Sequence, residues 1–247
     1  MSVILSVRHL TKKYEKFTLD DLSFEVESGM IMGLIGRNGA GKTTTMKSIL
    51  NLTPISGGEI LYFGQNLRDH EANIKEQIGY AGGAVDYYKK KKLRDIVRIT
   101  KTFYGSWSDA LYKKYAKLFD LDADKTPAQL SQGMRVKLNL AIALSHGAKL
   151  LILDEPTSGL DPVSREALLE IFRYLARAGV AILFSTHITS DLDKCADAIT
   201  YIRKGKMEFT GPMELYIQQC REQGIGTNLE EIMVHFEKEA LHEKLDA

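Results

Sequence analysis

The chain has 247 residues, enough for one large domain or a core with a subdomain, and its 33 basic and 32 acidic residues leave a formal net charge of +1. A nearly neutral chain lacks the positive field that attracts nucleic acid, so we expect no nucleic-acid partner. Its most apolar runs have strand length, and its first residues lack the pattern of a secretory signal. Cys195 and Cys220 form no metal or redox motif and are interpreted as free thiols. The composition predicts a soluble intracellular protein.

The first elements along the chain are predicted strands. Apolar residues alternate over 4–10 and 22–26, the pattern of strands that bury one face. The apolar run 30–35 predicts a third strand, and a helix is expected over 42–52. The third strand leads directly into GRNGAGKTT, residues 36–44, which matches the phosphate-loop pattern G-x-x-x-x-G-K-[ST] in full.

A strand, a glycine loop and a helix N-terminus together direct several backbone N–H groups toward one phosphate chain. Glycines let the backbone approach the phosphates, Lys42 places a positive charge on the β and γ oxygens, and Thr43 can offer its hydroxyl to Mg²⁺. The alternative is a glycine turn between unrelated elements, which this context disfavours. The loop therefore predicts binding of a nucleoside triphosphate. Its expected contacts are Gly36, Asn38, Gly39, Ala40, Gly41, Lys42, Thr43 and Thr44.

The middle of the chain changes from strand to helix periodicity. Residues 58–65 read as a strand with glycine turns, whereas apolar residues recur at helical spacing from about 93 to 145. A mostly helical insert therefore separates the phosphate loop from the next strand.

Strands and helices alternate again after the insert. Strands are predicted over 150–153 and 180–184. The helix between them has Asp161 as its N-cap, Pro162 at its first position and Gly179 at its end. Such alternation implies parallel crossover connections, and hence an α/β core.

The tail, residues 212–247, is predicted as two helices, the second of which opens with a capping box from Thr227 to Glu230. Its apolar side chains are interpreted as packing back on the core, and stabilisation of a dimer is the alternative. These side chains are Leu229, Ile232, Met233 and Phe236.

Two acids follow the apolar strand LLIL. The strand holds Asp154 rigidly where a carboxylate can bind Mg²⁺, and Glu155 can polarise a water for in-line attack on the γ-phosphate. The alternative is that these acids cap a helix or lie in a loop.

LSQGM, residues 130–134, opens a helix, and alone its Ser131 is an ordinary N-cap. Phosphate loops occur in many classes of enzyme, and the order of the other motifs chooses among them. That order is LSQGM, LLILDEP, SGLDP and then STH, residues 185–187.

With these motifs in this order, the sequence resembles the ATP-binding subunits of ABC transporters from Tyr14 to about Gly211. The resemblance implies one ABC ATPase domain of the α/β class: a phosphate-loop (RecA-like) core with a mostly parallel sheet, an N-terminal antiparallel β subdomain and an inserted α-helical subdomain. Its expected parts are the nucleotide-binding core at 1–84 and 147–211, the helical subdomain with LSQGM at 85–146 and the helical tail at 212–247.

The resemblance assigns a role in ATP binding and hydrolysis to each motif. Tyr14 would stack on adenine, and Thr43 and Asp154 would hold Mg²⁺. Lys42, Glu155 and His187 would be the catalytic residues; as an isolated residue His187 would more often be structural.

The resemblance further implies a second ABC ATPase subunit, identical or a paralogue. Ser131 and Gly133 would contact the ATP bound to that subunit, and Asp161 would couple the two sites. Gln132 and Met134 depart from the commonest form of the LSGGQ-type motif.

A further departure concerns the glutamine loop of the family. Gly83 stands where the family usually has Gln, and Asp86 is the alternative. The lysine run Lys89–Lys92 follows. A charge run is usually a solvated face, and the alternatives are a contact with acidic segments of a membrane partner or with anionic lipid head groups.

Residues 103–122 together with LSQGM resemble the ATPases of ABC-2-type bacterial exporters, including a subgroup linked to antimicrobial and surfactant peptides. This resemblance implies a separate integral membrane permease and export of peptide, drug or lipid-like compounds. It also implies a cytoplasmic location, peripheral on the inner face of the cell membrane. The alternative is an ATP-dependent regulatory switch that translocates nothing.

Overall fold

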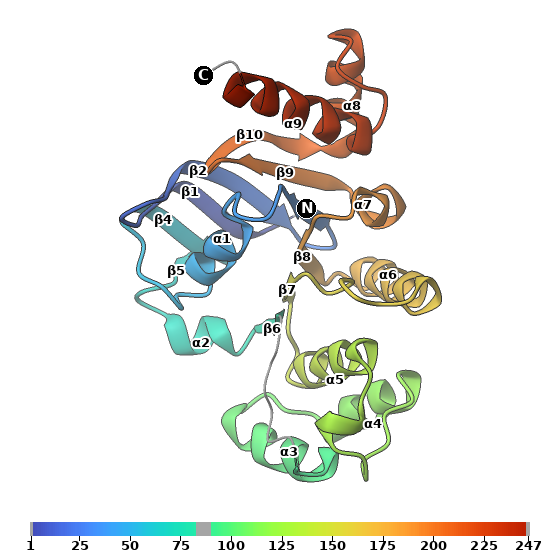
Figure 1. The fold of residues 1–247 in the computed structure, drawn as a ribbon. Coiled ribbons are helices and arrows are strands. Elements are labelled where there is room, and N and C mark those ends of the chain that lie inside the picture. Colours follow the sequence, from blue (N-terminus) through green and yellow to red (C-terminus); the bar gives the residue numbers. More distant parts are fainter. Residues whose placement is uncertain (1, 83–89, 246–247) are drawn as a thin grey trace.

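The computed structural model describes residues 2–82 and 90–245. Across these residues ten strands form one sheet in the order β5-β4-β1-β2-β10-β9-β3-β8-β7-β6 (Figure 1). The strands are β1 (Val3–Lys13), β2 (Thr18–Glu27), β3 (Ile31–Ile35), β4 (Gly57–Tyr62), β5 (Gln65–Asn66), β6 (Ile78–Gly82), β7 (Leu150–Asp154), β8 (Ala181–Thr186), β9 (Ala198–Arg203) and β10 (Lys206–Pro212).

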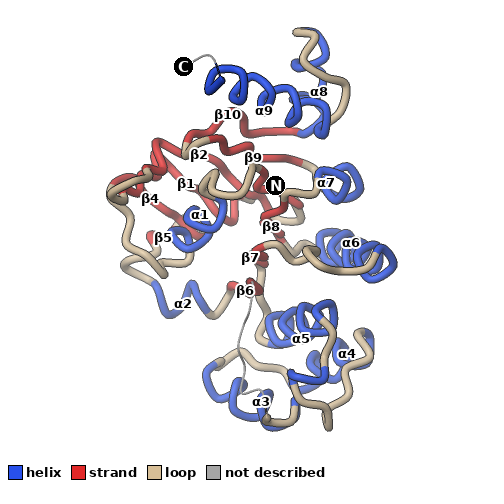
Figure 2. Tube along the Cα trace, in the orientation of Figure 1, coloured by secondary structure: helices blue, strands red, loops and turns tan. Residues whose placement is uncertain are grey.

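Helices surround this sheet (Figure 2). The α-helices are α1 (Lys42–Ile49), α2 (Glu71–Lys75), α3 (Leu93–Thr100), α4 (Asp109–Leu118), α5 (Gln132–Ser145), α6 (Pro162–Arg177), α7 (Thr189–Cys195), α8 (Met213–Glu222) and α9 (Leu229–Leu245). Two short 3₁₀ helices are η1 (Lys101–Phe103) and η2 (Pro127–Gln129).

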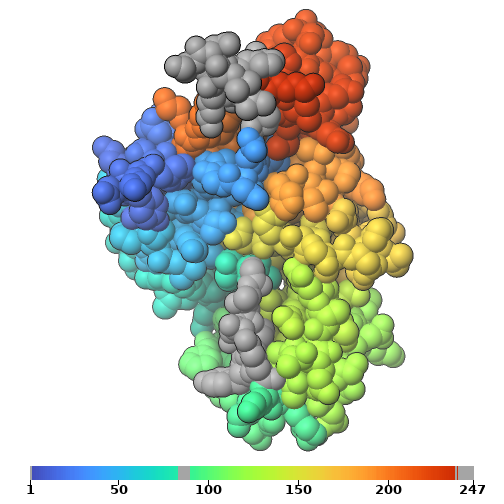
Figure 3. Space-filling view, in the orientation of Figure 1, coloured from blue at the N-terminus to red at the C-terminus, as the bar shows by residue number. Residues whose placement is uncertain are grey.

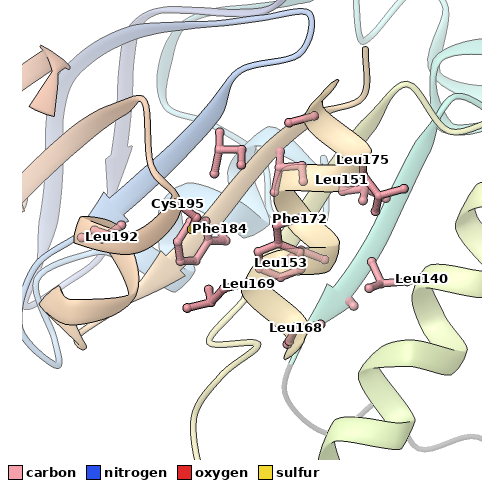
Figure 4. Close-up of a cluster of buried hydrophobic side chains, with 14 of the residues drawn as sticks. Leu140, Leu151, Leu153, Leu168, Leu169, Phe172, Leu175, Phe184, Leu192 and Cys195 are labelled. Atoms are coloured by element: carbon pink, nitrogen blue, oxygen red, sulfur yellow. The ribbon is translucent and has the colours of Figure 1, made fainter. Parts of the chain in front are cut away.

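The strands β9, β3, β8, β7 and β6 are parallel neighbours. Along β7, Leu151 and Leu153 pack in a core with α5, α6 and α7 (Figure 4). Leu150 and Ile152 pack in a second core with Met46 of α1. Because both faces are covered, every residue of β3 is buried, and the strand is a continuous apolar run instead of an alternating one.

The other end of the sheet is antiparallel. β1 pairs with β2 and with β4, and β5 extends the edge beyond β4. Leu22, Phe24 and Val26 alternate along β2 and are buried in the core that contains α1, as their period of two predicts. The predicted fold class, a mostly parallel core joined to an N-terminal antiparallel region, is confirmed.

The strand with glycine turns predicted over 58–65 is confirmed as β4, but it ends at Tyr62 instead of residue 65. The chain forms a hairpin of β4 and β5, and its turn contains Phe63 at φ +52° and Gly64 at φ +76°. A left-handed conformation is rare for a bulky residue such as Phe, so the sequence does not indicate that the strand ends before Phe63.

A helical insert lies between β6 and β7 and has an apolar cluster of its own. Leu93, Ile96 and Val97 of α3 are buried in it together with Leu138 and Ile142 of α5. The insert forms one end of the molecule, and α8 and α9 lie at the opposite end (Figure 1). The residue limits of the subdomains stay a prediction.

The tail packs back on the core, as predicted. Leu229 and Ile232 of α9 are buried in the same core as α6. The ring of Phe236 lies 6.2 Å from the ring of Tyr201 and 5.1 Å from the guanidinium of Arg203.

The capping box predicted from Thr227 to Glu230 is wrong by one residue. Helix α9 begins at Leu229, and the side chain of Asn228 accepts a hydrogen bond from the backbone N–H of Glu231 at 2.9 Å. The carboxylate of Glu231, not that of Glu230, accepts from the backbone N–H of Thr227 at 2.7 Å. Asn is as good an N-cap as Thr, and here Asn228 takes that position.

Candidate functional site: a phosphate loop beside two strand-end carboxylates

The phosphate loop joins the end of β3 to the start of α1. Gly36 has φ +149°, and a Cβ at this position would lie 2.3 Å from the carbonyl oxygen of Ile202, so a side chain cannot fit. Gly41, at φ +122°, is the N-cap of α1 and has no side chain to bond the first N–H groups of the helix. These N–H groups and the helix dipole are therefore available to an anion.

A cleft of about 620 Å³ opens over this loop. Its volume is within the range of small-molecule sites, roughly 300–1,000 Å³. The predicted residues Asn38, Gly39, Gly41, Lys42, Thr43, Thr44, Glu155 and His187 line it, together with Phe17, Arg37 and Ser158. The fold therefore brings the loop, the end of β7 and the residue after β8 into one cavity.

Lys42 is buried at the first position of α1, with 6% of its surface exposed. Its ammonium donates a hydrogen bond to the carbonyl oxygen of Gly36 at 2.7 Å and lies 3.4 Å from Oε1 of Glu155. A buried ammonium needs such partners, because desolvation otherwise disfavours its charge. The two contacts hold a positive charge between the loop and the carboxylate.

The residues expected to bind Mg²⁺ are adjacent. Oγ1 of Thr43, in the first turn of α1, lies 3.2 Å from Oδ2 of Asp154, the last residue of β7. The hydroxyl of Ser185 in β8 donates to Oδ1 of Asp154 at 2.5 Å and orients the carboxylate. A hydroxyl and a carboxylate beside a phosphate loop are the oxygen donors that Mg²⁺ takes together with phosphate oxygens. These donors fit the ion.

Glu155 is held between the two other predicted catalytic side chains. Its Oε1 lies 3.4 Å from Nζ of Lys42, and its Oε2 lies 2.9 Å from Nδ1 of His187, just after β8. Glu155 has φ +51°, an uncommon value for a residue other than glycine, and its N–H donates to Oγ of Ser185 at 3.0 Å. The turn that ends β7 directs this carboxylate into the cleft, and Ser185 holds the turn.

Tyr14 and Phe17 share a tight turn after β1, in which the N–H of Tyr14 donates to the carbonyl of Phe17 at 2.8 Å. Of the residues that the structure describes, Phe17 and not Tyr14 lines the cleft. Tyr14 is 48% exposed, and Nζ of Lys12 lies 4.9 Å from its ring centroid. Stacking of adenine on Tyr14 therefore stays a prediction, and Phe17 is a second aromatic residue at this place.

We expect Tyr14→Ala to weaken ATP binding about tenfold, because base–aromatic stacking contributes roughly 1–3 kcal/mol. Binding of inorganic tripolyphosphate, which has no base, should be unchanged. Titration calorimetry with both ligands measures this, and Phe17→Ala is the matched variant. If Tyr14→Ala keeps full ATP affinity and Phe17→Ala loses ATP affinity, adenine stacks on Phe17 and not on Tyr14.

The LSQGM segment lies at the start of α5. The hydroxyl of Ser131 is the N-cap and accepts from the N–H of Met134 at 3.3 Å. Gly133 is buried, and a Cβ there would lie 3.4 Å from the side chain of Leu160. In the described part of the chain, neither Ser131 nor Gly133 lines the cleft over the phosphate loop. A role for both on the nucleotide of a second subunit stays a prediction.

Ser131→Arg is the test of that role. A guanidinium at the N-terminus of α5 would occupy the place expected for the other subunit's phosphate, so we expect ATP-dependent dimerisation to be lost. Binding of ATP to the monomer should be unchanged, because Ser131 does not line the chain's own cleft. Sedimentation velocity and a nucleotide titration separate the two effects. Loss of both would mean that the residue is merely structural.

Asp161 caps α6, as predicted. Its carboxylate accepts from the N–H groups of Val163 at 3.1 Å and Ser164 at 3.0 Å. The pKa of Asp161 is lowered mainly by a hydrogen bond from the side chain of Ser164, and next by one from its backbone N–H. The capping carboxylate is therefore anionic at neutral pH. The loop before it contacts the LSQGM helix, since Nε2 of Gln132 donates to the carbonyl of Ser158 at 2.6 Å. Coupling by Asp161 between two sites stays a prediction.

The two candidates for the glutamine-loop position, Gly83 and Asp86, lie outside the described residues, as does Lys89. Of the lysine run, Lys90 and Lys91 are exposed, and Lys92 forms an ion pair with Asp124 at 2.8 Å.

Two sets of contacts in this region depend on the fold and could not be placed from the motifs alone. Ser185, which contacts both strand-end acids, is the Ser of STH, but only the sheet register places it beside Asp154. A second example is the ion pair between Asp191 of α7 and Arg165 of α6, whose atoms lie 3.9 Å apart. Asp191 is 1% exposed, so this pair ties the helix after His187 to the helix after Asp161.

Across the part of the chain that the structure describes, no helix combines the length and apolar character needed to cross a membrane.

Comparisons with known proteins agree with this geometry. The family model described as "ABC transporter" matches residues 19–158. The bacitracin transport ATP-binding protein BcrA of Bacillus licheniformis is 33% identical over 84% of this chain and 69% of its own length. The lantibiotic transport ATP-binding protein SrtF of Streptococcus pyogenes is 34% identical over 83% of this chain and 89% of its own. A solved structure titled "Structure of ATP binding subunit of ABC transporter" superposes with a TM-score of 0.82 at 31% identity, covering 94% of this chain and 98% of that chain. The chain therefore belongs to the ABC transporter family, as an ATP-binding subunit.

Proposed function

We propose that this chain hydrolyses ATP in a Mg²⁺-dependent reaction, as one half of a dimer that drives a separate membrane permease. The observation that carries the proposal is the position of Glu155, whose two carboxylate oxygens lie within 3.4 Å of Lys42 and 2.9 Å of His187. A base, a cation and a proton-bearing ring are thus held together over a phosphate loop.

Each side chain has a separate task in this proposal. Glu155 orients and polarises the attacking water, while Lys42 stabilises negative charge on the β and γ oxygens. His187 has Nδ1 at Glu155, and in its protonated form both ring nitrogens are donors, so that Nε2 donates toward the γ-phosphate. Thr43 and Asp154 would hold Mg²⁺, which when bound neutralises charge on the phosphate oxygens.

Residues that do not line the chain's own cleft support the proposed dimer. Ser131 and Gly133 stand at the N-terminus of a 14-residue helix, where N–H groups and the helix dipole favour a phosphate. A second subunit related by a two-fold axis would supply that phosphate, so that two ATP lie at the interface. ATP then stabilises the dimer, hydrolysis releases it, and the difference can move a partner.

Export across the cell membrane is the transport function that we infer. Relatives are named for bacitracin transport, lantibiotic transport and probable multidrug transport, which supports the export of peptide, drug or lipid-like compounds that the resemblance implies. The substrate would be bound by the permease, and this chain would lie at the inner face of the membrane.

Affinity purification of the tagged chain from gently solubilised membranes of its host tests the partner, with the untagged chain as control. We expect one polytopic membrane protein in stoichiometric amount, and a second ATPase beside it would show a heterodimer. Recovery of the chain from the soluble fraction alone, without any membrane protein, would contradict the permease and favour a regulatory switch.

A further inference from the structure

The helical insert has a large positive net charge, although the net charge of the whole chain is close to zero. Residues 90–145 contain 12 Lys or Arg against five Asp, a net charge of +7, although the whole chain has +1. The tail helices are opposite in sign, because residues 213–245 contain three basic and seven acidic residues, a net charge of −4.

These two segments lie at opposite ends of the molecule. The insert forms the end that contains α3 and α4, and the tail α8 and α9 forms the other end (Figures 1 and 3). The molecule is therefore an electric dipole. A negatively charged plane attracts the basic end of such a molecule and repels the acidic end, so the basic end turns toward the plane. At physiological salt this electrostatic attraction extends about 8–10 Å from the plane.

The basic end also exposes apolar side chains. Phe103 of η1 is 74% exposed, and Ile99, one helical turn earlier in α3, is 42% exposed. Arg98 stands before Ile99 and Lys101 between Ile99 and Phe103, and they form ion pairs with Asp95 at 3.1 Å and Asp109 at 3.2 Å. Lys90 and Lys91 are exposed just before α3. An aromatic and an aliphatic side chain among cations is the composition that inserts shallowly at a bilayer surface while the cations contact head groups.

We propose that this end of the insert, which we call the basic end and define by Lys90, Lys91, Ile99, Phe103 and the exposed lysines of α4, binds the anionic lipid surface of the membrane. The lysines of α4 are Lys113, Lys114 and Lys117. The contact is made by the ATPase itself, in addition to any contact with a permease. The distribution of charge favours lipid over one acidic peptide, because the cations are spread over the segment before α3 and helix α4 and the acidic tail is at the far end.

Co-sedimentation of the purified chain, residues 1–247, with vesicles tests the proposal, without permease or ATP. One set of vesicles is phosphatidylcholine alone, and in the other a third of the lipid is phosphatidylglycerol. We expect about tenfold more binding to the anionic vesicles, with loss of that binding as salt is raised.

Two double variants with the same change of net charge show whether binding depends on the basic end or only on the net charge of the protein. Lys90→Glu/Lys91→Glu should lose most binding to anionic vesicles, whereas Lys47→Glu/Lys206→Glu, exposed lysines of α1 and β10, should retain it. Phe103→Ser tests the apolar contact without changing charge and should weaken binding several-fold.

Equal binding to both vesicles, or equal loss in the two double variants, would overturn the proposal. Because these vesicles contain no permease and no ATP, a failure here leaves the proposed ATPase function untouched.

Discussion

Glu155→Gln is expected to lower the rate of ATP hydrolysis about a thousandfold, because a general base contributes roughly 10² to 10⁴ to the rate. The amide has nearly the shape of the carboxylate but cannot accept a proton from water, and it removes the negative charge that faces Lys42 at 3.4 Å and His187 at 2.9 Å. Binding of ATP should be retained, since the loop and Lys42 are intact. Release of phosphate under saturating ATP measures the effect.

The control for this variant is Glu170→Gln, an equal change at an exposed position of α6. It should hydrolyse ATP at the parent rate. If Glu155→Gln also does so, Glu155 is not the general base, and the cluster of Glu155, Lys42 and His187 has another purpose.

Lys42→Ala is expected to weaken ATP binding about 100-fold or more, because charge-assisted contacts to phosphate are among the strongest that a protein makes. The variant removes the ammonium that lies inside the cleft and also its hydrogen bond to the carbonyl of Gly36 at 2.7 Å. Loss of that bond leaves the loop less ordered, which adds to the loss of affinity. Titration with a fluorescent ATP analogue measures it.

Lys47→Ala is the matched control, since Lys47 is exposed at the last turn of the same helix. It should bind ATP like the parent. Thermal unfolding of both variants separates a folding defect from a binding defect. Tight ATP binding by a folded Lys42→Ala would contradict the assignment of the phosphate loop.

The sequence predicted those parts of the fold that depend on neighbouring residues. The phosphate loop, the N-cap at Asp161 and the apolar strand β7 each have a local pattern, and the structure has them where the pattern lies. The predicted strand over 58–65 extends too far, because the turn after Tyr62 places Phe63 in a left-handed conformation, which residue preferences disfavour.

The order of strands had no signal in the sequence. β10 lies between β2 and β9, and its pairing with β2 involves Lys206 and Asp20, residues far apart along the chain. The same reason explains the missed parts of the site. Ser185 reaches Asp154 through the register of β7 and β8, and Phe17 reaches the cleft through a turn that Tyr14 also shares.

The molecular mass of Glu155→Gln in solution, with and without ATP and Mg²⁺, tests the central claim most directly. Light scattering should give 27.7 kDa without nucleotide and twice that mass with it, because ATP is bound between two subunits and is not hydrolysed. Adding Ser131→Arg should return the mass to that of the monomer. A mass that stays at 27.7 kDa while ATP saturates the cleft would contradict the dimer, and with it the account of how hydrolysis moves a partner.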